Sequence, residues 1–347
     1  MDKPTFKMAF KGGVISILIT LVGIVPYRYA EGNTDITPYI INGNTASTIT
    51  YPYMGILIIN RLSEPSNSVE SFCGGTLVNE QYVLTAAHCL YTNTPSEFKN
   101  LEVVFNVDNI QNDIFNRTNT YAATEIYYPK AFKPNDNFQN DIALIKLASP
   151  VLETVVSSRN FVNLAPDESY RVDNQKFSVI GYGKTGPDDD SSDTLQAVQV
   201  EYAQPEQCNG IFVGGAISDT QICVTGEVVN DLQSGVCGGD SGGPLLYENN
   251  GTLYQAGIVS FGPKQCGDST VAIQSVYTEI YDYSDWLAGV FNGTTKPQYD
   301  VTKLEVPDTN SNNSSSEGSV GWGWGGLLML LAIFRKPPVQ SIKKRQQ

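Results

Sequence analysis

Short hydrophobic runs bounded by turn-forming residues recur through the middle of the chain. Aliphatic, β-branched and aromatic residues predominate in these runs, and Gly, Pro, Asn, Asp and Ser gather between them. Regularly spaced short runs of this kind predict the strands of an all-β sandwich or barrel. Examples are the runs at 54–59, 82–85, 101–107, 142–147, 177–180, 195–201 and 257–261.

One segment near the end of this region has the period of a helix instead. Ile280, Tyr283, Leu287 and Val290 recur every three or four residues, which places them on one helical face. Trp286 favours a packed helix over a frayed tail, because a large indole ring is mostly buried in folded proteins. We therefore expect a C-terminal helix within 280–291.

The composition changes after this segment. Small polar residues dominate 308–316, which predicts a flexible linker over 293–319. The folded part is then 40–292, and a double β-barrel uses ~200–250 residues as a single unit. We expect one folded domain in that range.

The N-terminal end has the layout of a secretory signal peptide. Three lysines within the first eleven residues precede an apolar run at 14–25. We assign 1–30 to the signal, with cleavage after Ala30, although Arg28 departs from the small-residue pattern before such a cut. An uncleaved anchor is the alternative.

A second apolar stretch lies near the other end. Residues 320–334 are apolar and rich in Gly and Trp, and five basic residues follow within 335–345. The stretch is short for a helical span, which needs ~17–25 residues. The basic residues would stay on the cytoplasmic side of a membrane.

Composition excludes several classes of function. The formal net charge is −14, and an acidic protein is repelled by phosphate backbones, so we expect no nucleic-acid partner. His88 is the only histidine, which excludes zinc sites built from several histidines. We expect that no cofactor is required and assign no metal ligands; calcium binding stays open, although no convincing carboxylate cluster in the sequence marks a calcium loop.

The cysteines indicate an oxidising compartment. There are six, an even number, and no two of them form a Cys-x-x-Cys pair, so disulfides are favoured over zinc or thioredoxin-like chemistry. Spacing alone leaves all 15 pairings of six cysteines open. The six are Cys73, Cys89, Cys208, Cys223, Cys237 and Cys266.

The candidate nucleophile is Ser241, in the hexapeptide GDSGGP at 239–244. Its glycines allow a sharp turn and a close approach of a substrate carbonyl. The backbone N–H groups of Gly239 and Ser241 are placed to converge on a developing oxyanion. The G-x-S-x-G pattern also occurs in α/β-hydrolases, but there the histidine follows the serine, whereas His88 precedes it. Chain order excludes that fold.

Two further residues supply what a serine nucleophile needs. A serine hydroxyl is weak unless a neighbouring base takes its proton, and His88 is the only imidazole available. It lies in TAAHC at 85–89, where small residues leave room for a substrate. Asp141 opens the apolar run at 141–147, and a carboxylate there would hold the imidazole tautomer and stabilise its charged form.

The order His88, Asp141, Ser241, together with the three local motifs, resembles the trypsin/chymotrypsin family of serine proteases. The resemblance covers about 40–291 and includes Cys-Gly-Gly-Thr-Leu at 73–77, Gly-Tyr-Gly at 181–183 and Ser-Phe-Gly at 260–262. It implies two antiparallel β-barrels packed face to face with a C-terminal helix. It also implies a Ser-His-Asp acyl-enzyme mechanism that cleaves protein or peptide substrates.

The resemblance implies the remaining site residues as well. The disulfides would be Cys73–Cys89, Cys208–Cys223 and Cys237–Cys266. The floor of the specificity pocket falls on Gly235, which carries no charge to select Lys or Arg. The pocket walls and the substrate-pairing strand fall on Val236, Ser260, Phe261, Gly262 and Ser275. A neutral pocket narrowed by Val236 would favour cleavage after small or medium apolar residues.

Maturation by proteolysis is implied in the same way. Family members are cut before an Ile-Val-Gly-Gly start, and this chain has Ile-Ile-Asn-Gly at 40–43. An activating protease would remove a propeptide at 31–39, and the new ammonium of Ile40 would pair with Asp240. Tyr39 stands before the cut where the family usually has Arg or Lys.

Residues 320–347 resemble the bacterial GlyGly-type C-terminal sorting signal. That resemblance implies transient anchoring in the inner membrane, removal by a membrane sorting protease, and release to the cell surface or the medium. A plain membrane anchor is the alternative, and a GPI signal fits less well because such signals end in the hydrophobic stretch.

A non-catalytic binding or adhesion module on the same fold is the alternative from another class. Family members without activity usually lack one of the three catalytic residues, and this chain has all three. We therefore expect an enzyme.

Overall fold

The structure is a computed structural model that describes residues 8–10, 13–15, 40–91, 93–117, 119–135, 137–157, 160–186, 191–208, 217–263, 265–272 and 275–304. Two short strands, β1 (Met8–Phe10) and β2 (Gly13–Ile15), pair antiparallel within the predicted signal peptide. Among the helices of the described residues, none is both long and apolar enough to cross a membrane.

The first half of the domain is a closed antiparallel barrel. Its strands lie in the order β8-β7-β4-β5-β6-β9, and pairing of β8 with β9 closes the ring. All five residues of β7 are buried, because β7 packs on both of its faces. The strands are β4 (Met54–Asn60), β5 (Val69–Leu77), β6 (Tyr82–Thr85), β7 (Leu101–Phe105), β8 (Thr120–Tyr127) and β9 (Ala143–Leu147). Its helical turns are α1 (His88–Tyr91), η1 (Glu97–Asn100) and α2 (Ile110–Asn116).

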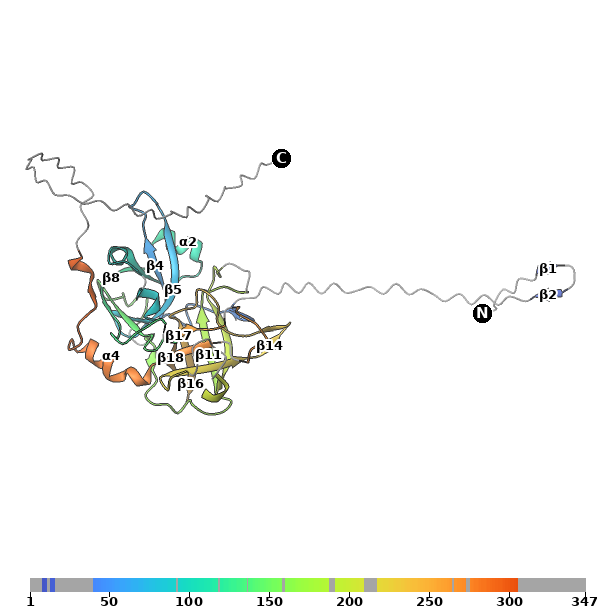
Figure 1. The fold of residues 1–347 in the computed structure, drawn as a ribbon. Coiled ribbons are helices and arrows are strands. Elements are labelled where there is room, and N and C mark those ends of the chain that lie inside the picture. Colours follow the sequence, from blue (N-terminus) through green and yellow to red (C-terminus); the bar gives the residue numbers. More distant parts are fainter. Residues whose placement is uncertain are drawn as a thin grey trace, which may run out of the picture. The chain divides into compact units, whose positions relative to one another are not determined.

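The second half forms a second closed barrel (Figure 1). Its order is β17-β16-β11-β12-β13-β18, closed by pairing of β17 with β18. The strands are β11 (Lys176–Gly181), β12 (Gln196–Ala203), β13 (Gln221–Gly226), β16 (Pro244–Asn249), β17 (Thr252–Phe261) and β18 (Ser275–Glu279). Smaller elements are β3 (Asn44–Thr45), β10 (Asn163–Leu164), α3 (Pro205–Cys208) and the hairpin of β14 (Val228–Val229) and β15 (Leu232–Gln233).

The prediction of two antiparallel barrels with a C-terminal helix is confirmed. The turn η3 (Tyr281–Tyr283) leads into α4 (Ser284–Phe291), drawn in orange in Figure 1. Leu287 and Val290 are buried on its inner face, and Trp286 packs against the same core. The 3.6-residue period therefore identified both the helix and its buried side.

The two barrels share a hydrophobic core and a buried polar link. Ile180, Leu246 and Ile258 of the second barrel belong to the same buried cluster as the core of the first. The hydroxyl of Thr76 donates a 2.7 Å hydrogen bond to the side-chain oxygen of Gln255, and both residues are fully buried. These contacts fix the seam along which the site residues lie.

The ordered chain continues beyond the predicted end of the domain. The flexible linker was expected to begin at 293, but 293–304 form β19 (Tyr299–Asp300) and η4 (Val301–Lys303). Strand β19 pairs antiparallel with β8 of the first barrel. The remainder of the predicted linker and the C-terminal segment at 320–347 lie outside the described residues.

We call residues 293–304 the C-terminal strap. The backbone N–H of Gln298 donates to the carbonyl of Ile126, and its side-chain oxygen accepts from the N–H of Tyr128, both at 2.8 Å. The ring centroids of Tyr299 and Phe98 lie 4.8 Å apart, and the side chain of Val301 is buried. A few apolar side chains and edge-strand pairing thus order a segment whose composition is mostly polar.

Candidate active site

His88 and Asp141 meet because of the register between two strands. β6 and β9 pair antiparallel with Thr85 opposite Ala143, so the chain leaving β6 runs beside the chain entering β9. Nδ1 of His88 lies 2.7 Å from Oδ2 of Asp141, and the backbone N–H of His88 donates to Oδ1 at 2.8 Å. The carboxylate therefore fixes both the ring and the backbone of His88.

The second barrel completes the surroundings of Asp141. The carboxyl group is fully buried, and a buried charge is costly without partners. Ser260, near the end of β17, donates its hydroxyl to Oδ2 at 2.5 Å. The hydroxyl of Thr278 donates to the Asp141 carbonyl at 2.8 Å. Ser260, which was predicted only as a substrate-binding residue, thus also holds the carboxylate across the seam.

Ser241 is held against the first barrel by a close approach of backbone. Its carbonyl accepts from the N–H of Gly74 at 2.8 Å. Gly242 has φ +79°, and a Cβ there would lie 2.2 Å from Oγ1 of Thr85 and 2.4 Å from the carbonyl of Gly74, so only glycine fits. The glycine after the serine is therefore required by contact between the two barrels.

Ser241 and His88 line the same cavity, with a volume of about 370 Å³. Their side chains are not hydrogen-bonded to each other in the described structure. Such bonds often tighten only when substrate binds. The structure therefore brings the three predicted residues to one cavity, with the His88–Asp141 contact already formed.

Asp240 immediately precedes the candidate nucleophile Ser241 and is fully buried. It accepts hydrogen bonds from the N–H of Gly183 at 2.8 Å and of Cys237 at 2.9 Å. Burial raises the pKa of Asp240 to about 7 against the effect of these two bonds. A Cβ at Gly181 or Gly183 would lie 2.2 Å or 2.6 Å from Oδ1, which explains the Gly-Tyr-Gly motif: its glycines make room for this carboxylate.

The activation residue Ile40 is also fully buried, as is Ile41. Ile40 has φ +29°, a conformation that a β-branched residue rarely adopts. The structure therefore places the predicted start of the mature chain inside the domain.

The described cysteines form the three disulfides that the resemblance implies, Cys73–Cys89, Cys208–Cys223 and Cys237–Cys266. The first joins β5 to the turn that carries His88. The third joins the nucleophile loop to the wall of the neighbouring cavity.

That neighbouring cavity has a volume of about 550 Å³ and opens beside Ser241. Its lining includes four of the predicted substrate-binding residues, Val236, Ser260, Phe261 and Gly262. The other two, Gly235 and Ser275, are buried and are not among its lining residues. The Ser275 hydroxyl instead accepts from the backbone N–H of Val236 at 3.3 Å. Val236, rather than Gly235, therefore lines this cavity.

Phe138 is a site residue that sequence reasoning missed. Its ring stands edge to face against His88, with centroids 5.7 Å apart, and stacks on Phe261 at 5.5 Å. Phe138 has φ +51°, as do few large side chains. An aromatic residue three positions before Asp141 in an Asn-rich loop was the signal available in the sequence.

Two groups of described residues each bring three side chains of metal-ligating types together. In both groups, some of these side chains already form other bonds. Cys73 and Cys89, beside His88, form a disulfide. In the group of Glu168, Glu279 and Asp282, the buried Glu279 accepts hydrogen bonds from Tyr170 and Arg171. Neither group presents a set of open ligands.

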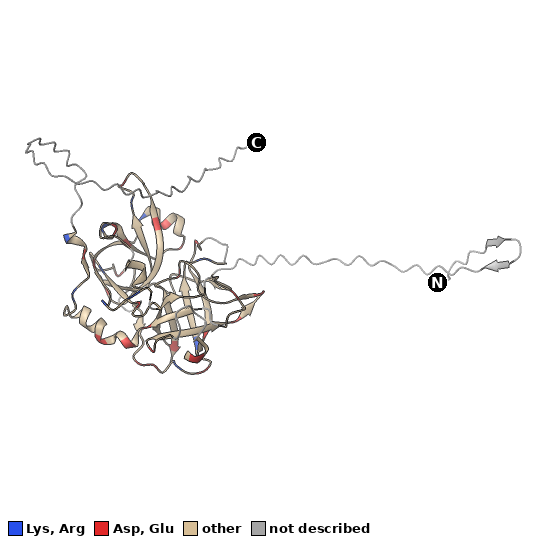
Figure 2. Cartoon of the chain, in the orientation of Figure 1, with Lys and Arg blue, Asp and Glu red and all other residues tan. Residues whose placement is uncertain are grey.

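In the view of Figure 2, the Lys and Arg positions of the described residues are separated from one another along the ribbon.

Comparison with known proteins agrees with the geometry. The family model described as Trypsin matches residues 40–287. The chain is 32% identical over 271 residues to CLIP domain-containing serine protease B15 of Anopheles gambiae, covering 75% of this chain and 71% of that protein. It is 30% identical to Phenoloxidase-activating factor 1 of Holotrichia diomphalia, covering 72% and 69%. It is also 30% identical over 217 residues to Trypsin-1 of Astacus astacus, covering 62% and 86%.

These relatives are animal proteins, so they lend no support to a bacterial sorting signal at 320–347. The match over the barrels is nevertheless broad, since the family model spans both of them and every predicted site residue. The chain therefore belongs to the trypsin family of serine proteases and is a hydrolase.

Proposed function

We propose that the chain is an endopeptidase in which Ser241 is the nucleophile, His88 the general base and acid, and Asp141 the residue that orients His88. The observation that carries this proposal is the two-point contact between His88 and Asp141. It keeps the imidazole proton on Nδ1, which leaves Nε2 free to accept the proton of the serine hydroxyl.

The reaction follows from these positions. Ser241 Oγ attacks the substrate carbonyl carbon while its proton passes to Nε2 of His88. His88 then gives that proton to the leaving amine, and an acyl-enzyme remains on Ser241. A water molecule then attacks the acyl carbon while its proton passes to Nε2 of His88. His88 gives that proton back to Ser241 Oγ, and the acid product leaves. The oxyanion would lie against the N–H groups of Gly239 and Ser241, and Gly239 supports this role because its φ of +101° is available to glycine alone.

A covalent serine-reactive probe tests the proposal. An alkyl fluorophosphonate reacts with an activated serine, so it should label the matured enzyme at Ser241 and label Ser241→Ala not at all. Labelling of neither protein, with both folded, would favour the non-catalytic module.

The cavity beside Ser241 supports cleavage after small or medium apolar residues. Val236, Val259 and the Cys237–Cys266 disulfide line it, and none of the described lining residues carries a carboxylate that would pair with Lys or Arg. Profiling the matured enzyme on a peptide library tests this. A dominant preference for Lys or Arg before the cut bond would show that the cavity is assigned wrongly.

Activation by cleavage before Ile40 is supported by two buried groups. Asp240 has hydrogen bonds from backbone N–H groups but no cationic partner among the described residues. A buried carboxyl of this kind is costly, and a new ammonium at Ile40 would relieve the cost. N-terminal sequencing of the active form tests this, because a start other than Ile40 contradicts it.

Export is supported by the three disulfides and by the names of relatives, which include Snake venom serine protease CL2 of Trimeresurus stejnegeri and Clotting factor G beta subunit of Tachypleus tridentatus. The signal peptide at 1–30 and removal of 320–347 by a sorting protease remain predictions. Mass spectrometry of the exported enzyme tests both, since an intact tail through Gln347 favours the plain anchor.

A further inference from the structure

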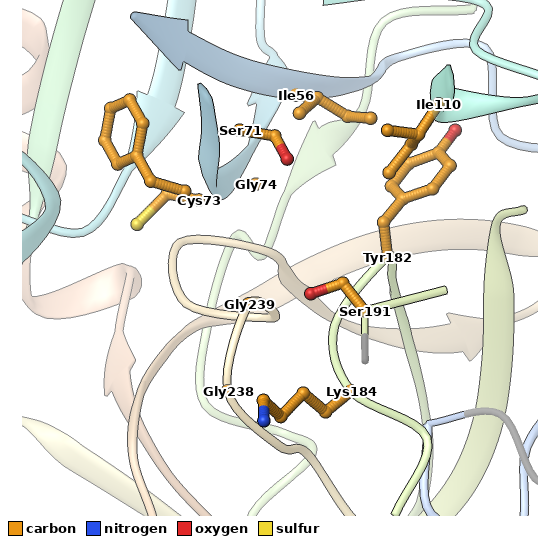
Figure 3. Close-up of a pocket in the computed structure, with 11 residues that line it drawn as sticks. Ile56, Ser71, Cys73, Gly74, Ile110, Tyr182, Lys184, Ser191, Gly238 and Gly239 are labelled. Carbon is orange, nitrogen blue, oxygen red and sulfur yellow. The ribbon is translucent and has the colours of Figure 1, made fainter. Parts of the chain in front are cut away.

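A third cavity lies across the oxyanion hole from the cavity that would hold the acyl side chain. Its volume is about 240 Å³, and both barrels line it. Phe72, Cys73 and Gly74 come from β5, whereas Gly238 and Gly239 come from the nucleophile loop (Figure 3). We call it the leaving-group cavity, because it lies on the side of Ser241 toward which we expect the leaving amine to point.

The position of this cavity relative to the reaction fixes which part of a substrate it meets. The acyl side of the substrate takes the cavity lined by Val236 and Ser260–Gly262, as proposed above. The leaving amine must then point to the other side of Ser241, toward the wall formed by the Cys73–Cys89 disulfide. Gly239 of the proposed oxyanion hole and Cys73 of this disulfide both line the leaving-group cavity, so we expect the first two residues after the cut bond, ~3.3–3.6 Å each, to lie along it.

Lys184 is the charged residue of this cavity. Its backbone N–H donates to the carbonyl of Gly238 at 2.7 Å, which holds the residue beside the oxyanion hole. A Cβ on Gly238 would lie 3.7 Å from the Lys184 side chain, so the aliphatic stem runs along this glycine (Figure 3). A larger residue in place of Gly238 would compete for that space.

Its ammonium group has no carboxylate partner within the described ranges. The other described residues that line the leaving-group cavity are all neutral. The stem of a half-buried lysine is already ordered by such packing, which reduces the entropy lost when its ammonium binds an anion.

We propose that Lys184 selects substrates with an acidic side chain in the first or second residue after the cut bond. This inference rests on the proposed proteolytic function and names a feature of its substrates. Lys184 also lines the rim of the acyl-side cavity. We assign its charge to the leaving-group side, because the stem of Lys184 runs along Gly238, and the next residue, Gly239, lines the leaving-group cavity but not the acyl-side cavity.

Matched peptides measure this selection. Internally quenched peptides that share one apolar residue before the cut would carry Asp or Asn, and Glu or Gln, at each of the two following positions. The readout is the ratio of kcat/KM for the acidic peptide to that for its amide partner. For the wild-type enzyme we expect a ratio of about five, which a partly exposed ion pair can supply.

Charge variants assign the effect to one residue. Lys184→Gln should bring the ratio to about one, and Lys184→Glu should invert it. The matched controls Lys176→Gln and Lys176→Glu change the net charge equally at an exposed residue of β11 that pairs with Glu201, and they should keep the wild-type ratio. A ratio that moves equally in both sets would mean a general charge effect and would overturn the proposal.

Three further outcomes would also overturn it. One is a wild-type ratio near one on both positions. Another is an acid preference at the residue before the cut instead of after it. The third is a preference that appears only when Asp188, Asp189 and Asp190, which follow Lys184 in the sequence and lie outside the described residues, are replaced by Asn. Failure of the proteolytic function itself looks different, because then no peptide of either charge is cut.

Discussion

The rings of Phe138 and His88 stand edge to face, 5.7 Å apart between centroids and at 81° to each other. Phe138 comes from the loop before β9, and its other neighbour, Phe261, ends β17 in the second barrel. The pair of phenylalanines therefore closes the space beside the imidazole from both barrels. The side chain of the second substrate residue before the cut bond must fit in the space that these two rings leave beside His88.

We predict that Phe138→Ala broadens the choice of residue at that position. With the ring present, small side chains such as Ala, Ser or Pro should be preferred. Without it, kcat/KM for peptides with Leu or Phe there should rise about tenfold relative to Ala, since one or two more methylene groups in an apolar site are worth about that much. Phe115→Ala, at an exposed residue of α2, is the control. An unchanged profile in Phe138→Ala would exclude the role.

The backbone of this loop explains why the sequence did not reveal Phe138. Three described residues between 137 and 140, Asn137, Phe138 and Asn140, have positive φ. The side chain of Gln221 holds the loop by donating to the carbonyl of Asn137 at 2.9 Å. The role of Phe138 thus depends on a strained turn and on a residue far away in the chain, and neither is visible in local sequence pattern.

Other parts of the structure were predictable because short-range physics determines them. The alternation of hydrophobic runs and turns marked most barrel strands, and the three-or-four-residue spacing marked α4. The motifs around His88, Asp141 and Ser241 are local, and the strand pairing that brings them together is a property of the fold. Lys184 was missed because its importance comes from packing along Gly238, and a lone lysine after a strand is usually a solvated residue.

The catalytic residues should behave as one unit. We predict that His88→Ala and Ser241→Ala each lower kcat at least about a thousandfold, and that the double variant is no slower than either. Asp141→Asn should cost about 10⁴ in kcat, because the amide would favour the wrong imidazole tautomer. Hydrolysis of a peptide ester measures all four. Rates surviving at a few per cent in either single variant would contradict the mechanism.

The stability of the uncut chain should depend on pH through Asp240. The pKa of Asp240 is about 7 in the folded chain and 3.8 when unperturbed, so Asp240 stays protonated up to a higher pH in the folded chain than in the unfolded chain. The contribution of Asp240 to the free energy of unfolding is then constant below about pH 4, falls as the pH rises to about 7, and is constant again above that pH. The loss is about 4 kcal/mol at most, from about three pH units at 1.36 kcal/mol each.

Cleavage before Ile40 should abolish this fall, because the new ammonium would stabilise the ionised carboxylate. Urea unfolding at pH 4.5 and 7.5 measures it, with the Ser241→Ala chain cut and uncut to prevent self-digestion. The Asp240→Asn variant of the uncut chain removes the titrating group and should lose the pH dependence between these two values. Equal pH dependence in the cut and uncut forms would show that the Ile40 ammonium does not reach Asp240.

The C-terminal strap should stabilise the first barrel although it carries none of the site residues. Deletion of residues 305–347 should leave the midpoint of thermal unfolding unchanged, since it keeps the strap's pairing with β8 and its contact with Phe98. Deletion from 293 onward should lower this midpoint by several degrees, because the deletion uncovers the edge of β8 and the ring of Phe98.

A point variant measures the ring contact alone. Tyr299→Ala in the chain ending at 304 should lower the free energy of unfolding by about 1–2 kcal/mol, because this ring contact is lost. Lys303→Ala, at an exposed residue that pairs with Asp300, is the control and should cost less than about 0.5 kcal/mol. If the two deletions unfold at the same temperature, 293–304 adds no stability, and the domain ends at α4 as the sequence suggested.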